Sequence, residues 1–161
     1  MDIPLLLGNE LFDQLTARAR ASQRRRMNLN LHPSPSSPAH RFLNAMEPDS
    51  YGAPHRHLAP GKDETTIVLR GRFGFLVFDE QGKITTKAIL GSGCDAVAAN
   101  VPAGTFHCLV SLEPGGVLME AKAGPYDRAT DKDWAPWAPA EGAAGAAGYL
   151  EKLRRLFKQP T

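Results

Sequence analysis

Histidine carries the clearest chemical pattern in this sequence. His55 and His57 are separated by one residue, Glu64 follows, and His107 comes three residues after the turn signal Pro102-Ala-Gly104. Successive side chains of a β-strand alternate between its faces, so His55 and His57 point the same way. Glu64 opens a run rich in β-branched residues, which predicts a second strand beside them. We therefore expect these three imidazoles and one carboxylate to hold one divalent ion, and the donor set suits Zn, Fe, Mn, Ni or Co without choosing among them.

Neighbouring residues offer alternatives to this ligand set. Asp63 can compete with Glu64 for the carboxylate role, although Glu64 stands seven residues before Gly71 and is the favoured ligand. His32 and His40 lie outside the pattern. Cys108 follows His107 directly, so it faces the other side of the strand and is expected to pack as a small apolar side chain.

The pattern resembles the two motifs of the cupin superfamily, His-x-His…Glu…Gly and Pro-x-Gly-x-x-His. It departs from them by the longer spacing of six residues, 58–63, between His57 and Glu64. A closer resemblance, to the WbuC-type cupin-fold metalloproteins, runs from about residue 9 to 142. It is carried by the segments 26–32, 41–44, 51–57, 78–82, 124–126 and 131–142. This resemblance implies a small bacterial metalloprotein associated with surface-polysaccharide biosynthesis.

The expected fold is mainly β: a cupin-type double-stranded β-helix, or jelly-roll barrel, with an N-terminal and a C-terminal helix. Turn signals separate short apolar runs that predict strands, at 26–32, 41–46, 52–57, 64–69, 73–78, 83–90, 96–101, 105–111 and 117–123. Helices are predicted at 10–21, with Asn9 as N-cap, and at about 149–158 after a small-residue linker at 140–148. We divide this single domain into an N-terminal helical segment (1–25), the barrel (26–126) and a Trp/Pro-rich clasp with the last helix (127–161).

Composition excludes several other classes of protein. The chain has 161 residues, 42% of them hydrophobic, and a formal net charge of +2, which is ordinary for one globular domain and too small to indicate nucleic-acid binding. The arginines at 24–26 favour a solvated helix end, since no aromatic residues are interleaved with them. We find neither an export signal nor a stretch of about 18 apolar residues. Reduced cysteines and a cytoplasmic location are therefore expected.

The predicted ligand of the site is a small molecule. Asn28, Asn30 and His32 form one polar strand face, Arg41 offers a forked cation for a carboxylate or phosphate, and Tyr51 adds a hydroxyl. The resemblance to WbuC-type cupins makes isomerisation or epimerisation of a sugar derivative the leading functional hypothesis. The alternatives are an Fe(II)-dependent dioxygenase, as in cupins with a similar ligand set, and a noncatalytic metal-dependent binding module. The amphipathic last helix and the edge strands of a jelly roll predict a homodimer.

Overall fold

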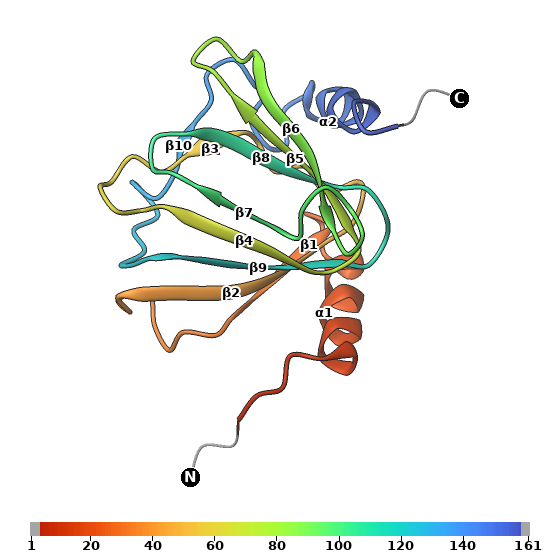
Figure 1. Ribbon diagram of the computed structural model, residues 1–161, viewed down its shortest axis with the longest axis vertical. Helices are drawn as coiled ribbons and strands as arrows, with labels where there is room; N and C mark the ends of the chain where they lie inside the picture. Colours follow the sequence, from red (N-terminus) through yellow and green to blue (C-terminus); the bar gives the residue numbers. More distant parts are fainter. Residues whose placement is uncertain (1–3, 159–161) are drawn as a thin grey trace.

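A computed structural model describes residues 4–158 as two facing antiparallel β-sheets with a helix on the outer side of each (Figure 1). Sheet 1 has the strand order β1 (Arg26–Asn30), β2 (Ala39–Met46), β9 (Gly116–Ala123), β4 (Glu64–Arg70) and β7 (Ala98–Val101). Sheet 2 has the order β10 (Asp133–Trp134), β3 (His55–Arg56), β8 (Phe106–Ser111), β5 (Arg72–Phe78) and β6 (Ile84–Gly91). The helices are α1 (Asn9–Ala21) and α2 (Ala146–Arg155). The predicted jelly-roll architecture with two terminal helices is confirmed.

Sheet 1 is apolar on the outside at the strands that α1 covers. Leu15 and Ala19 of α1 are buried against Leu43, Ala45 and Val117, and Met27, Leu29 and Leu31 pack around this cluster. Fully burying a leucine side chain stabilises a fold by about 1.5–3 kcal/mol. Because side chains alternate along a strand, the residues between these apolar positions face the space between the two sheets. The interior face of β1 carries Asn28 and Asn30, and that of β2 carries His40 and Asn44 together with Phe42 and Met46.

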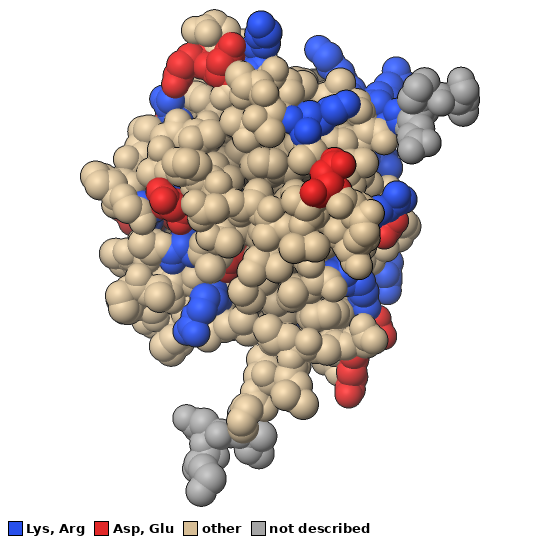
Figure 2. Space-filling model, viewed as in Figure 1, with Lys and Arg blue, Asp and Glu red and all other residues tan. Residues whose placement is uncertain are grey.

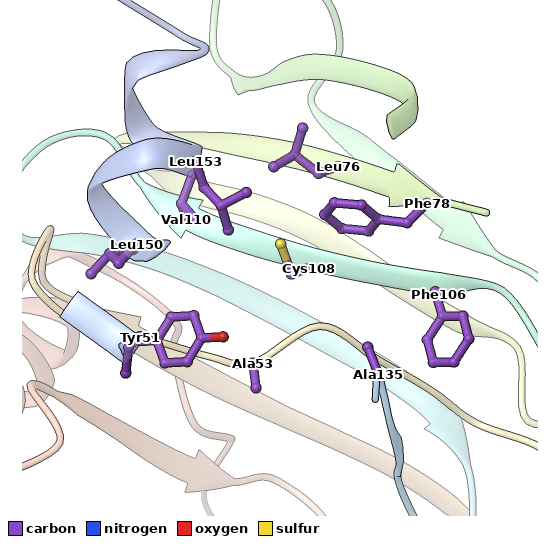
Figure 3. Packing of buried hydrophobic residues seen from close by; sticks show 11 residues of the cluster. Tyr51, Ala53, Leu76, Phe78, Phe106, Cys108, Val110, Ala135, Leu150 and Leu153 are labelled. Carbon is purple, nitrogen blue, oxygen red and sulfur yellow. The ribbon is translucent and has the colours of Figure 1, made fainter. Parts of the chain in front are cut away.

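Sheet 2 carries its own apolar cluster on the side covered by α2 (Figure 3). Leu150 and Leu153 of α2 pack over Leu76, Cys108 and Val110. Burial raises the pKa of the Cys108 thiol to about 12, which agrees with a packing role. The apolar face of α2 is thus occupied within the chain, and the homodimer prediction keeps only the edge strands as its support.

Element boundaries differ from the predicted ones for local reasons. Asn9 is the first helical residue and not the N-cap, because Gly8 precedes the helix with extended backbone and without a side-chain cap. Strand β3 is shorter than predicted, since Pro54 has no N–H to donate to a ladder. Strand β10 was not predicted, and α2 begins at Ala146 inside the predicted linker. Residues 1–3 and 159–161 of the predicted terminal segments lie outside the described residues.

Within residues 4–158, no helix is long and apolar enough to cross a membrane. On the face shown in Figure 2, the Lys and Arg side chains of the described residues are scattered among acidic and uncharged ones and form no continuous patch.

Candidate metal centre

The three motif histidines meet in the space between the sheets. His55 in β3 is paired directly with His107 in β8, and their ring centroids are 4.8 Å apart. His57 lies two residues further along the chain on the same side, with its ring centroid 5.2 Å from that of His55. One possible ligand atom from each of the three side chains lies within 4.8 Å of the others.

Glu64 reaches this cluster from the opposite sheet. It opens β4 and is buried, and its Oε2 lies 3.1 Å from Nε2 of His57. Its Oε1 lies 3.4 Å from Nε2 of His107. The turn before β8 is tied to the same region, because the N–H of Gly104, at a φ of +84°, donates to the carbonyl of His57 over 2.7 Å. The long loop at 58–63 thus still delivers the carboxylate to the histidines.

Backbone carbonyls fix the orientation of all three imidazole rings. Nδ1 of His55 lies 3.1 Å from the carbonyl of Ala53, and Nδ1 of His107 lies 2.9 Å from that of Thr105. Nδ1 of His57 is hydrogen-bonded to the carbonyl of Asp131. A carbonyl only accepts, so each Nδ1 carries the hydrogen and each Nε2 is left with a free lone pair. This arrangement is typical of histidines that bind a metal through Nε2.

The arrangement of acceptors tests whether a cation fits. Nε2 of neutral His57 and the carboxylate of Glu64 are both acceptors at 3.1 Å, so their contact is repulsive unless a proton or a cation lies close to both. Nε2 of His107 is buried without a hydrogen-bond partner within residues 4–158. A buried polar atom of this kind is costly unless it is satisfied. A divalent ion bound by these atoms would remove both problems, so the residues fit a metal.

Burial and neighbouring charges favour the protonation states that a metal requires. Burial, assisted by the positive charge of Lys132, lowers the pKa of His55 well below its usual value. For Glu64, burial alone would raise the pKa, but the neighbouring His107 and His57 and the charge of Lys122 hold it well below the usual range. Neutral imidazole and ionised carboxylate are the forms that bind metals.

A buried charge network that the sequence did not reveal supports the cluster from behind. Lys122 is the direct cross-strand partner of Glu64, and its Nζ lies 3.7 Å from Oε2 of Glu64. The same ammonium lies 2.9 Å from a carboxylate oxygen of Asp131, whose other oxygen is 3.3 Å from Nζ of Lys62. Asp131 therefore anchors His57 through its carbonyl and Lys122 through its carboxylate. The only sequence signal was the alternation at 120–122, which reads equally well as a solvated face.

The cluster of candidate metal ligands forms one wall of a cavity of about 910 Å³, which His55, Glu64 and His107 line. The predicted ligand residues Asn28, Asn30 and His32 line it. His32 is buried and stacks on His40 with 4.0 Å between the ring centroids, so both histidines excluded from the metal set belong to the cavity. The structure thus brings the β1 polar face to the candidate metal centre, in the role of a cavity wall.

Three other predicted residues lie elsewhere. Arg41 is exposed and absent from the cavity lining, because His40 and Phe42 on either side of it in β2 take the inward positions. Tyr51 is buried in the apolar cluster under α2 and donates its hydroxyl to the carbonyl of Pro139 over 2.8 Å. These positions correct the expectation that Arg41 and Tyr51 contact the ligand. Asp63 is exposed and accepts the N–H of Ala103 over 2.9 Å, which favours Glu64 as the carboxylate.

Solved structures with a similar fold include two cupin-fold proteins. KdgF from Halomonas sp. is 20% identical, with a TM-score of 0.50, over 63% of this chain and 82% of its own. Oxalate decarboxylase from Bacillus subtilis is 17% identical, with a TM-score of 0.52, over 68% of this chain. This chain spans only 27% of that enzyme, for which another structure concerns its Mn(II) centres. At these identities the likeness shows the cupin fold and nothing further.

Sequence comparison gives a family without a described activity. No curated protein sequence matches the chain. A family model described as a domain of unknown function, DUF6016, matches residues 7–90, which is more than half of the chain. The protein therefore belongs to the DUF6016 family and has a cupin fold with a histidine cluster that can hold a metal ion.

Proposed function

We propose that this protein binds one divalent metal through His55, His57, Glu64 and His107, and uses it to bind and isomerise or epimerise a small sugar-derived or carboxylate ligand. The observation that carries the proposal is the convergence of lone pairs at the cavity wall. Three carbonyl-anchored imidazoles and a carboxylate present acceptors to one another, and none of the four supplies a donor to these contacts. Bound there, the ion would supply Lewis-acid polarisation of a ligand oxygen.

The charge of the cavity favours an anionic ligand. Five cationic side chains line it, against three carboxylates; the cations are those of Arg24, Arg26, Lys122, Arg128 and Lys132, and the carboxylates those of Glu64, Glu120 and Asp131. With a divalent ion added, the positive charge dominates. The volume of about 910 Å³ suits a small molecule and not a polymer. The asparagines of β1 add donors and acceptors for hydroxyl groups.

Several titratable side chains that are not in the proposed ligand set face the same cavity. Such groups support proton-transfer chemistry, as isomerases and epimerases require, over the dioxygenase alternative. The resemblance to WbuC-type cupins supports a sugar derivative of surface-polysaccharide biosynthesis as the ligand. A noncatalytic metal-dependent binding module is the alternative to an enzyme, and a turnover assay distinguishes the two. We also propose a homodimer, which light scattering at micromolar concentration tests.

Calorimetry on metal-free and metal-loaded protein tests the proposal. Citrate, sugar acids and nucleotide-sugars are titrated into protein stripped with chelator and into protein loaded with Zn or Mn. We expect binding of at least one class only in the loaded protein, and weaker binding in Lys132→Met. Arg41→Ala is the matched control, since Arg41 is an exposed cation outside the cavity. Equal binding to the metal-free protein would show that the ion does not take part in ligand binding.

A further inference from the structure

Glu120 is a cavity carboxyl that forms no ion pair with another of the described residues. It lies in β9, between Phe42 of β2 and Thr66 of β4 in the register, and its side chain lines the cavity. Within residues 4–158, Glu64 and Asp131 each have an ammonium within 4.0 Å, whereas the carboxylate of Glu120 has no such ion pair. Glu120 is thus the unpaired acid of this cavity.

Lys132 is its counterpart on the opposite wall. It lies directly before β10 and lines the same cavity. Its ammonium lies 5.4 Å from the centroid of the Trp134 ring, and among the described residues no carboxylate lies within 4.0 Å of it. The charge of each group shifts the pKa of the other, but Glu120 and Lys132 do not form an ion pair. An acid and an ammonium are therefore held apart across the cavity that contains the candidate metal centre.

An unpaired charge in a partly buried position is costly, which makes this separation informative. Lys122 and Asp131 show that the fold can pair buried charges in this region, since their ammonium and carboxylate are 2.9 Å apart. Glu120 and Lys132 both line the cavity without pairing with each other, so both are available to contact a ligand there. Complementary groups are an oxyanion or carbonyl oxygen for Lys132 and a transferable proton for Glu120.

The surroundings of Glu120 suit a group that exchanges protons near neutral pH. Burial, followed by the negative charge of Glu64, raises the pKa of Glu120 to about 7. Burial lowers the pKa of Lys132. The polar and charged side chains that act on Glu120 come from four strands and the segment before β10; they are Arg26 of β1, Asn44 of β2, Glu64 of β4, Lys122 of β9 and Lys132.

We propose that Glu120 and Lys132 form the proton-transfer pair of this site and act on a hydroxy acid or sugar acid that carries a carbonyl group. This inference rests on the proposed function. The ionised carboxylate of Glu120 takes the proton from the carbon next to the carbonyl. The electrons of that C–H bond form a C=C bond, and those of the C=O bond move to oxygen. The resulting enolate oxygen accepts a hydrogen bond from the Lys132 ammonium, and Glu120 returns the proton to carbon, so no oxidant or reductant is needed.

Deuterium incorporation tests the step. The Zn-loaded protein is incubated in D₂O with D-glucuronate and D-galacturonate, and the C2 proton, next to the aldehyde carbon of the open-chain form, is followed by ¹H NMR. We expect loss of that signal for at least one of them, slowed at least about 100-fold in Glu120→Gln. A slowing of about 100-fold is expected in Lys132→Met. Glu120→Asp should restore part of the rate. The control is Glu113→Gln, which removes a carboxylate paired with Arg72 outside the cavity lining.

Two further measurements separate the possible failures. Zn content by elemental analysis should be unchanged in Glu120→Gln, because Glu120 is not in the ligand set. In ¹³C-Glu-labelled, metal-free protein, the resonance missing from Glu120→Gln should titrate near pH 7; titration at the ordinary value of about 4.3 overturns the inference without any ligand. Calorimetric binding of either sugar acid without deuterium incorporation overturns the inference alone. If neither binds, the proposed function fails for this ligand class and the inference fails with it.

Discussion

Replacing Lys122 with methionine should destabilise the metal-free protein and strengthen metal binding. The Lys122 ammonium is buried between two carboxylates, 3.7 Å from Glu64 and 2.9 Å from Asp131. At an effective dielectric constant of about 20, a pair at the longer distance is worth about 4.5 kcal/mol. Asp131 keeps Lys62 at 3.3 Å, and the variant no longer has to bury an ammonium. We therefore expect the free energy of unfolding of the metal-free protein to fall by about 3 kcal/mol. This is near the lower end of the cost of removing one partner of a buried ion pair.

Metal binding should halve the loss of stability in Lys122→Met. A divalent ion compensates the charge of Glu64, so the loaded variant should be only about 1.5 kcal/mol less stable than the loaded parent. The difference of about 1.5 kcal/mol between the two states corresponds to roughly tenfold tighter metal binding in Lys122→Met, because stability and binding are linked. For a chain of this length, about 3 kcal/mol lowers the Tm by roughly 6–12 °C.

Thermal unfolding with chelator and with excess Zn, together with a metal-competition titration, measures both effects. Lys83→Met is the control, since Lys83 is an exposed lysine outside the network. If the metal-free variant unfolds within 1 °C of the parent, to within the roughly 0.5 kcal/mol expected of a neutral surface change, the buried pair contributes no stability. Weaker metal binding in the variant would show that the ammonium does not compete with the ion for Glu64.

Three further predictions concern the ligands, the pH dependence and the packing of α2. His57→Ala and His107→Ala should lose most of the bound metal in elemental analysis, whereas Asp63→Asn should keep it; full retention in both histidine variants would exclude them as ligands. In the metal-free protein, burial lowers the pKa of His55 below the value of about 6.5 in the unfolded chain. The unfolded chain then binds the extra proton, so stability should fall as the pH drops through 6.5 and fall less in His55→Gln, as urea unfolding at pH 7 and pH 5 can show. Leu153→Ala should lower the free energy of unfolding by about 2–5 kcal/mol, because Leu153 is only 3% exposed; a loss below 1 kcal/mol in chemical denaturation would show that α2 is loosely attached.

Local spacing predicted the strands and the shared face of His55 and His57, and the resemblance to the cupin motifs predicted the barrel fold in which His107 meets them. A His-x-His pair in a strand and a turn at 102–104 followed by His107 place three side chains on one side of sheet 2. The pairing of β10 with β3 was missed because it joins two-residue strands that are far apart in the chain. A bridge that short leaves no periodic signal.

The side-chain face of sheet 1 was harder to predict. Alternation showed that Asn28 and Asn30 share a face and that His40 and Arg41 face opposite ways, but not which face of β2 points into the cavity. The roles of Lys122 and Asp131 depend on a long-range register and on the course of the segment after β9. Neither follows from spacing, so the buried network behind the histidines needed the structure.

The two faces of sheet 1 differ in what a mutation there would affect: the outer face affects folding stability, and the inner face affects the cavity. Residues that hold β1 and β2 in place point outward to α1, whereas Asn28, Asn30 and Phe42 point into the cavity and take no part in that apolar cluster. Substitutions on the inner face can therefore change ligand preference with little loss of folding stability. A helix that stabilises one side of a sheet leaves the other side free to change while the scaffold is kept.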